Sequence, residues 1–380
     1  MAGRARTAAA SAPGAPGTAV APAASATAPG RVLAVQFLHE QTPGSGEDAE
    51  PLLTTLGTDA ALLAVFDGLG GAGSETVGTA GGPRSGAYLA SRLAGEVVER
   101  CSYVLRATAA TGELPGKPAQ RALGADFARR LETDLHLEFS RAAQQLGSPR
   151  TRLRSTLFKT LPTTLVAAHC LYDAAAGAGQ VEVYWAGDSR AFLLSPTEGL
   201  HQLTHDDLRS GGDALANLSE DSPVSNCVSA DAPFVIHYAT AAFEGPHVVL
   251  VATDGCFGFV STPAHFEHLL LDALDRARSL GGWRANLEAA VQAIAGDDAS
   301  MAAVALGWDD VAELRRDFRP RHALVAERFV DPLAGRDERL AELRASLASE
   351  QAARDELRLR LWEEYRASYE SLMPPARSGS

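Results

Sequence analysis

The sequence has few cysteines and no long apolar run. Its four cysteines are scattered and form no C-x-x-C pair, so a disulfide-stapled secreted domain is not expected, and we predict reduced thiols in a cytoplasmic protein. No stretch reaches the roughly 18 consecutive apolar residues that a membrane-spanning helix needs. We therefore expect no membrane insertion.

Positive charge is also scarce. Lysine and arginine total 34 against 47 aspartates and glutamates, which gives a net charge of −13 at pH 7. No basic face is evident, so nucleic acids and anionic membranes are not expected partners. The 380 residues, 46% of them hydrophobic, are enough for one large domain or two ordinary ones and are typical of a soluble globular protein. The acidic balance indicates either a solvated surface or a need for cations.

Composition divides the chain into three parts. Residues 1–31 are rich in Ala, Pro, Ser and Gly, which predicts a disordered tail, with a transit peptide as the alternative. Residues 32–310 hold alternating apolar segments, as a folded domain does. Residues 311–380 are strongly charged with a helical pattern, which predicts a charged helical C-terminal extension.

The extension contains a row of leucines at heptad spacing: Leu340, Leu343, Leu347, Leu357 and Leu361. Glu350 and Arg354 interrupt this row, so a long uninterrupted coiled coil is not expected. The extension either docks on its own domain or serves as an arm that binds a partner.

The order of segments within the folded part indicates the fold class. Short turns join several of its apolar segments, which antiparallel strands allow and parallel βαβ units do not. The pattern therefore predicts an α+β sandwich and not a doubly wound sheet. The expected elements are strands at 31–40 and 60–68, helices at 82–105 and 118–147, a strand-rich block from 163 to 255, helices at 262–280 and 283–296, and a strand at 300–308.

Acidic motifs recur where these strands begin or end. They are "GEDA" with Glu47 and Asp48, "VFDGLGG" with Asp67, "VATDGCFG" with Asp254, and "AGDDAS" with Asp297 and Asp298. Strand ends can converge on one edge of a core, where ionised carboxylates repel one another unless cations compensate them. Hard divalent ions such as Mg²⁺ or Mn²⁺ take oxygen ligands of this kind. The alternative is that each Asp-Gly pair is only a turn.

Two other enzyme classes share single motifs with this chain. Gly68, Gly70 and Gly73 have the G-x-G-x-x-G spacing of a dinucleotide-binding loop, but Asp67 would repel a pyrophosphate there, and the segments that follow are not βαβ. The "GDS" at Ser189 resembles the nucleophile motif of serine esterases. No histidine stands in the D-x-x-H that those enzymes need, so both classes are disfavoured.

Seven motifs, taken in order, resemble the metal-dependent protein phosphatases of the PPM type (type 2C), bacterial branch. They are "GEDA", "VFDGLGG", "PTTLVAA", "WAGDSRAFLL", "QLTHDDL", "VATDGCFG" and "GDDASMAAVAL", within roughly residues 32–308. The resemblance implies a four-layer αββα sandwich with two central antiparallel sheets flanked by helices. It also implies a serine/threonine phosphatase that uses two Mn²⁺ or Mg²⁺ ions.

Roles for individual residues follow from the same resemblance. Asp67 would bridge the two ions, and Asp48 would orient the attacking water. The Gly68 carbonyl and Glu47 would hold one ion, and Asp254 and Asp297 the other. Asp188 of "GDS" corresponds to the ligand of a third ion in many members.

The implied reaction is attack of a metal-bridged hydroxide on phosphoserine or phosphothreonine, without a covalent enzyme intermediate. Cys256, although it lies within the Asp254 motif, is then expected to be a small buried apolar residue. The implied partners are phosphorylated proteins and an opposing serine/threonine kinase. The alternative is a catalytically weak or inactive pseudophosphatase that acts as a protein-binding module.

The chain departs from the family pattern at three positions. Leu69 stands where many eukaryotic members have a histidine, Pro43 where members tend to have a phosphate-binding arginine, and Gly258 where the second ligand of a third ion is found. His39, Arg154 and Lys159 are candidate substitutes for the phosphate-binding arginine. Residues 206–237 correspond to the variable flap beside the active site and suit either a substrate-selecting segment or a plain surface loop.

Overall fold

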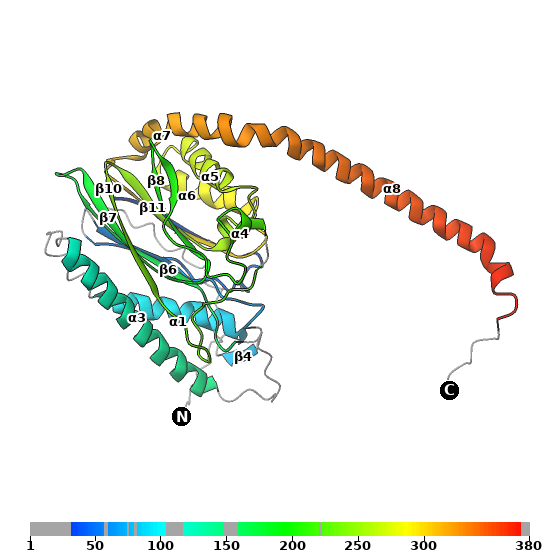
Figure 1. The fold of residues 1–380 in the computed structure, drawn as a ribbon, viewed down its shortest axis with the longest axis horizontal. Helices are drawn as coiled ribbons and strands as arrows, with labels where there is room; N and C mark the ends of the chain where they lie inside the picture. The colour runs from blue at the N-terminus through cyan, green and yellow to red at the C-terminus, as the bar shows by residue number, and fades with distance from the viewer. Residues whose placement is uncertain are drawn as a thin grey trace, which may run out of the picture. The chain divides into compact units, whose positions relative to one another are not determined.

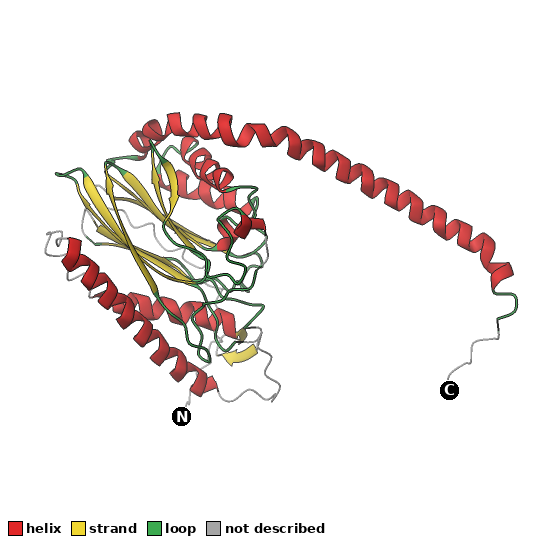
Figure 2. Ribbon diagram, viewed as in Figure 1, coloured by secondary structure: helices red, strands yellow, loops and turns green. Residues whose placement is uncertain are grey.

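Two five-stranded antiparallel sheets lie face to face in the computed structural model. The described residues are 32–56, 60–73, 76–79, 82–103, 117–146, 159–219 and 222–373. The predicted tail and Arg154 fall outside these ranges. Helices cover the outer face of each sheet (Figure 1; Figure 2), so the predicted α+β class, with two antiparallel sheets flanked by helices, is confirmed.

The first sheet has the strand order β1-β12-β11-β8-β9. Its strands are β1 (Val32–His39), β8 (Arg190–Ser195), β9 (Gly199–Gln202), β11 (His247–Ala252) and β12 (Ala299–Leu306). The second sheet has the order β10-β7-β6-β3-β2. Its strands are β2 (Leu52–Thr55), β3 (Ala60–Val65), β6 (Leu165–Asp173), β7 (Ala178–Ala186) and β10 (His237–Glu244).

The facing sides of the two sheets form one apolar core. Every residue of β3 is buried, as is every residue of β11 and β12, which is why these segments read as unbroken apolar runs. Valines and leucines interleave with alanines here, among them Val65, Val166, Val249 and Val304. The small side chains let the sheets approach closely, and this packing fixes the strand ends relative to one another.

Helices α1 (Gly86–Cys101) and α3 (Lys117–Leu146) cover the second sheet, and α5 (Pro263–Asp275) and α6 (Leu280–Gln292) cover the first (Figure 1). Ser85 caps α1, because its side chain accepts a hydrogen bond from the Tyr88 amide. We expected a helix from residue 82, but residues 82–85 form β5 (Gly82–Ser85), which pairs with β4 (Thr76–Thr79) as a small hairpin. Pro83 and the absence of apolar residues before Gly86 explain why the helix begins later.

The residues beyond 310 form two helices with different surroundings. Helix α7 (Val311–Val325) packs on the first sheet's outer layer through Leu314 and Phe318, and Arg321 makes a two-pronged ion pair with Glu267 of α5 at 2.7 and 3.0 Å. A short π-helical turn (Ala326–Val330) leads to α8 (Asp331–Tyr369), whose described side chains are exposed. Among the described residues, no helix is long and apolar enough to span a membrane. The predicted domain limits stay a prediction.

Candidate metal centre

Strands β1, β3, β7 and β11 end at the same edge of the sandwich, where β2, β6, β8 and β12 begin. Strand pairing places His39 opposite Ala299, Val65 opposite Val166, and Ala252 opposite Arg190. The acidic motifs occupy the connections between these strand ends. Although they are far apart in the sequence, the antiparallel topology brings them to one place.

Asp67 and Gly68 follow β3 and are held in position through their backbone. The Asp67 carbonyl accepts hydrogen bonds from the Thr164 amide at 2.9 Å and the Thr163 hydroxyl at 2.6 Å. Both threonines belong to the "PTT" motif. A Cβ atom on Gly68 would lie 2.7 Å from the carbonyl oxygens of both Glu47 and Ala87, so only glycine fits this close approach. The Asp67 carboxylate is thereby left to face the cluster.

Glu47 and Asp48 lie between β1 and β2. The Ser85 hydroxyl donates to the Glu47 carboxylate, and that carboxylate lies so close to Gly70 that a side chain at position 70 would collide with it. Asp48 is 1% exposed, and its Oδ2 accepts a 2.9 Å hydrogen bond from the Thr253 hydroxyl. The acidic pair is therefore fixed by contacts with three separate segments.

Asp254 opens a short 3₁₀ turn after β11, and Asp297 precedes β12. The turn fits tightly against the second loop, because a side chain at Gly255 would collide with the backbone carbonyl of Asp298. Asp298 receives hydrogen bonds from the amides of Gln41 at 2.8 Å and Glu47 at 2.6 Å. Asp298 thus holds the loop in place, while the neighbouring Asp297 has an exposed side chain.

Asp188 lies in the turn between β7 and β8. Its Oδ1 is buried and has no hydrogen-bond partner. The next residue, Ser189, is 1% exposed and shares a 2.7 Å hydrogen bond with Thr164, which rules out its service as an accessible esterase nucleophile. Arg190 forms a two-pronged ion pair with Asp206 at 2.9 and 2.6 Å, so its role is structural.

The electrostatics show how closely these groups lie. Burial, followed by repulsion from neighbouring aspartates, raises the pKa of Asp48 to about 8 and that of Asp67 well above its usual value. Burial and the charge of Asp254 raise the pKa of Asp188 to about 8. Burial and the charge of Asp297 raise the pKa of Asp254 to about 6. Each carboxylate therefore lacks enough positive charge around it in the protein alone.

These residues fit a pair of hard divalent cations. Every candidate ligand is an oxygen, as Mg²⁺ and Mn²⁺ prefer. The unpartnered Asp188 oxygen and the mutually repelling carboxylates are the features that a bound cation would compensate. The structure brings all the predicted ligands, namely Glu47, Asp67, Gly68, Asp188, Asp254 and Asp297, to this edge together with Asp48.

Within the described part of the chain, no hydrogen bond or ion pair links Lys159 or His39, two of the predicted substitutes for the phosphate-binding arginine, to the acidic residues. Lys159 donates to Cys227 Sγ at 2.9 Å, and His39 is the last residue of β1. A residue that the sequence did not single out is Arg84 on β5. Its guanidinium donates to the Gly44 carbonyl at 2.5 Å, next to the position where Pro43 replaces the family arginine. The β4–β5 hairpin, which lies between β3 and α1, places Arg84 here. That hairpin was not predicted from the sequence.

Arg92 was also missed. Its guanidinium lies 3.4 Å from the centre of the Tyr88 ring, and that of Arg84 lies 4.4 Å from the same ring. Arg92 donates to the carbonyls of Glu47 and Gly46 at 3.3 and 3.4 Å. It therefore braces the loop that carries the acidic pair, while Arg84 lies at the side of that loop. The helical spacing of Tyr88 and Arg92 was the available signal.

None of the cysteines is a candidate nucleophile. All four are buried and free. Cys256 is 0% exposed, donates weakly to the Ser300 carbonyl at 3.3 Å, and has a pKa raised well above its usual value by burial. It is a small buried residue, as expected.

Comparison with known proteins gives a family and a set of similar folds. The sequence profile of the protein phosphatase 2C family matches residues 40–292. No curated protein matches the chain. Among solved structures, the serine/threonine phosphatase Stp1 from Staphylococcus aureus is similar, with a TM-score of 0.50 and 14% identity over 72% of this chain and 94% of that one.

Two structures of the phosphatase PstP are similar at lower scores. The Mycobacterium tuberculosis PstP has a TM-score of 0.47 and 16% identity over 73% of this chain and 99% of that one. A PstP catalytic domain solved in complex with two manganese ions has a TM-score of 0.46 and 18% identity, over 72% of this chain and 97% of that one.

Proposed function

The chain belongs to the protein phosphatase 2C family, and on that premise we propose that it is a metal-dependent phosphatase acting on phosphoserine and phosphothreonine in proteins. The observation that supports this most strongly is the convergence of oxygen ligands from five connections on one edge of the sandwich. Burial, and after it the repulsion between neighbouring aspartates, raises the pKa values of Asp48, Asp67, Asp188 and Asp254.

Two divalent cations, Mn²⁺ or Mg²⁺, are proposed to bind here. Asp67 would contact both, Glu47 and the Gly68 carbonyl one, and Asp254 and Asp297 the other. When bound, such ions lower the pKa of water and stabilise negative charge on the phosphoryl oxygens. Gly258, four residues beyond Asp254, has no side chain that could serve as the second ligand of a third ion, so we propose a two-ion centre.

The protein's own residues would align the reaction. Asp48 is fixed by the Thr253 hydroxyl at 2.9 Å and lies within hydrogen-bond reach of the Asp67 carboxyl group, and it would orient the attacking water. Arg84 would pair with the phosphoryl group, because it is half-buried next to the acidic loop and its guanidinium retains donors beyond the single bond to Gly44. Leu69 cannot donate a proton, so protonation of the leaving serine oxygen would fall to water.

The substrates would then be phosphorylated proteins, and a serine/threonine kinase would be the enzyme that opposes this one. A cytoplasmic location is proposed on the reduced state of the four free cysteines. The segment 208–236, which follows the buried Asp206–Arg190 pair, is proposed to contact the substrate protein.

The test is hydrolysis of p-nitrophenyl phosphate and a phosphothreonine peptide with and without Mn²⁺. The wild type should turn over only with the metal, and Asp67→Asn should lose nearly all activity. Asp272→Asn, an exposed carboxylate on α5 paired with Arg276, is the matched control and should leave turnover unchanged. A well-folded wild type without turnover at any Mn²⁺ concentration would overturn the enzymatic proposal and leave the alternative, a pseudophosphatase that acts as a protein-binding module.

A further inference from the structure

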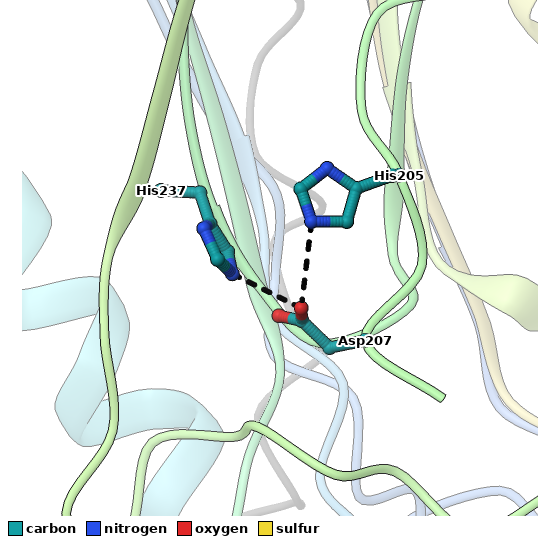
Figure 3. A group of neighbouring side chains, drawn as sticks. All are labelled: His205, Asp207 and His237. Atoms are coloured by element: carbon teal, nitrogen blue, oxygen red, sulfur yellow. Dashed lines mark hydrogen bonds and ion pairs between the residues drawn. The ribbon is translucent and has the colours of Figure 1, made fainter. Parts of the chain in front are cut away.

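A second group of possible metal ligands lies outside the carboxylate centre. His205, Asp207 and His237 each direct one ligand atom to a common point, and these atoms lie within 4.8 Å of one another (Figure 3). His205 and Asp207 follow β9, and His237 is the first residue of β10. None of the three belongs to the proposed catalytic residues.

Asp207 is oriented as metal-binding carboxylates are. Its Oδ2 accepts hydrogen bonds from the Gly187 amide at 3.0 Å and the Asn226 side chain at 2.7 Å. Its Oδ1 is turned to the two imidazoles, 3.0 Å from His237 Nε2 and 3.7 Å from His205 Nε2. Hydrogen bonds of this kind to the outer oxygen hold a ligand in place before the metal arrives.

The two imidazoles are also held. Trp185 packs against both rings, with centroid separations of 5.0 Å to His205 and 5.1 Å to His237. Its indole N–H donates to the His205 carbonyl at 2.9 Å. Ligand atoms around a tetrahedral zinc ion are about 3.3 Å apart. The two distances to Asp207 Oδ1, 3.0 and 3.7 Å, lie on either side of that value, and all three ligand atoms lie within 4.8 Å of one another.

We propose that His205, Asp207 and His237 bind a zinc-class transition-metal ion with open coordination positions. Imidazole nitrogens favour such an ion over Mg²⁺, which prefers oxygen throughout. The ion would tie together the two ends of the segment 208–236, because Asp207 precedes it and His237 follows it. It would also be linked to the β7–β8 turn, since Gly187 binds Asp207 and precedes Asp188.

The test is calorimetric titration of the full chain with Zn²⁺ in excess Mg²⁺. The wild type should bind one more equivalent than His205→Ala or His237→Ala, and Asp67→Asn should retain that equivalent. His201→Ala, an exposed histidine on β9, is the control and should bind as the wild type does. Because the His205 side chain is 65% exposed, its removal should leave the fold intact, which thermal melting checks.

Co²⁺ provides a second readout, because its visible absorption reports imidazole ligation. The band should appear in the wild type and in Asp67→Asn and should be lost in both histidine variants. Equal Zn²⁺ equivalents in the wild type and both histidine variants would overturn the proposal. That result would leave the phosphatase proposal untouched, since it concerns other residues.

A different observation concerns α8. Five leucines that share one side of this helix, 39 residues long, are between 43% and 58% exposed: Leu340, Leu343, Leu347, Leu357 and Leu361. Glu350 and Arg354 occupy the two intervening positions of the heptad. A long helix without tertiary packing gains little stability from its own hydrogen bonds, so this row is expected to have a partner.

The leucine row of α8 can pair with the same row of a second copy that runs in the opposite direction. About a two-fold axis midway between Glu350 and Arg354, an antiparallel second copy places its Arg354 opposite Glu350. The same operation places Leu357 of the second copy opposite Leu347, and Leu361 of the second copy opposite Leu343. The polar pair that interrupts a parallel seam therefore becomes a reciprocal pair of opposite charges.

We infer that α8 pairs with α8 of a second copy of this chain in antiparallel register. Sedimentation equilibrium of the full chain should show a dimer, and Glu350→Arg or Arg354→Glu alone should weaken it at least tenfold. The double variant, which exchanges the two charges, should restore dimerisation. Glu356→Arg, on another side of the helix, should have no effect. A monomeric wild type, or a double variant no better than the single ones, would overturn the inference.

Discussion

The Thr253 hydroxyl donates to Asp48 Oδ2 at 2.9 Å and accepts from the Ser300 amide at 2.8 Å. Asp48 lies before β2, Thr253 lies directly after β11, and Ser300 is the second residue of β12. A single hydroxyl thus connects three strand ends and fixes the carboxylate assigned to the attacking water. Thr253→Val keeps the shape and removes the donor.

Thr253→Val is expected to reduce kcat by about tenfold, because an unsatisfied buried acceptor costs roughly 1–3 kcal/mol. The KM for a phosphopeptide should change little, since Asp48 does not bind the phosphoryl group. Thr240→Val, which removes a half-buried hydroxyl on β10, is the control. A higher KM for the phosphopeptide with an unchanged kcat would contradict the role given to Asp48.

Gly70→Ala should weaken Mn²⁺ binding. The added methyl group would collide with the Glu47 carboxylate and displace a proposed ligand. Activity at limiting Mn²⁺ should fall by about tenfold or more, the effect of roughly 1.4 kcal/mol in ligand strain, and recover in part at high Mn²⁺. Gly71→Ala is the neighbouring control, because no atom lies within 4 Å of its added carbon; equal behaviour of the two variants would be evidence against Glu47 as a ligand.

Arg84→Ala should raise the KM for phosphopeptides more than it lowers kcat. Removal of a charged partner of the phosphoryl group costs about 1.5–3 kcal/mol, which corresponds to a roughly 10- to 150-fold loss in kcat/KM. Steady-state kinetics at saturating Mn²⁺ measure this. Arg129→Ala, which removes an exposed arginine on α3, is the control and should leave KM and kcat unchanged. Wild-type kinetics in Arg84→Ala would show that Arg84 does not bind the phosphoryl group.

The metal-free protein should be less stable at alkaline pH. The pKa values of Asp48 and Asp254 are raised to about 8 and about 6 in the folded chain. Between about pH 4 and pH 8 the folded state therefore holds protons that the unfolded state has released, so the free energy of unfolding falls as pH rises. Thermal melting in EDTA should give a lower Tm at pH 8 than at pH 6. Mn²⁺ should raise the Tm more at pH 8 than at pH 6, because its ligands are deprotonated at pH 8. A Tm that rises with pH in EDTA would contradict the raised pKa values of Asp48 and Asp254.

Much of this fold could be predicted because apolar runs and Asp-Gly pairs mark where strands end. Asp67 and Asp254 were predictable for that reason, as each follows a fully buried strand. Arg84 was not, because residues 82–85 form a short strand without apolar alternation. His205, Asp207 and His237 escaped attention for a different reason. His205 and Asp207 lie within "QLTHDDL", but His237 is 30 residues farther along the chain. Only the pairing of β10 with β7 brings His237 opposite Trp185 and near the other two.

The acidic residues of the centre belong to different halves of the sandwich. Asp254 extends from β11 in one sheet, whereas Asp67 extends from β3 in the other. Cations bound between them would hold the two halves together at this edge of the sandwich. Loss of the ions would then weaken the contact between the two sheets at this edge. The same metal–carboxylate bonds would therefore serve both the proposed catalysis and the stability of the sandwich.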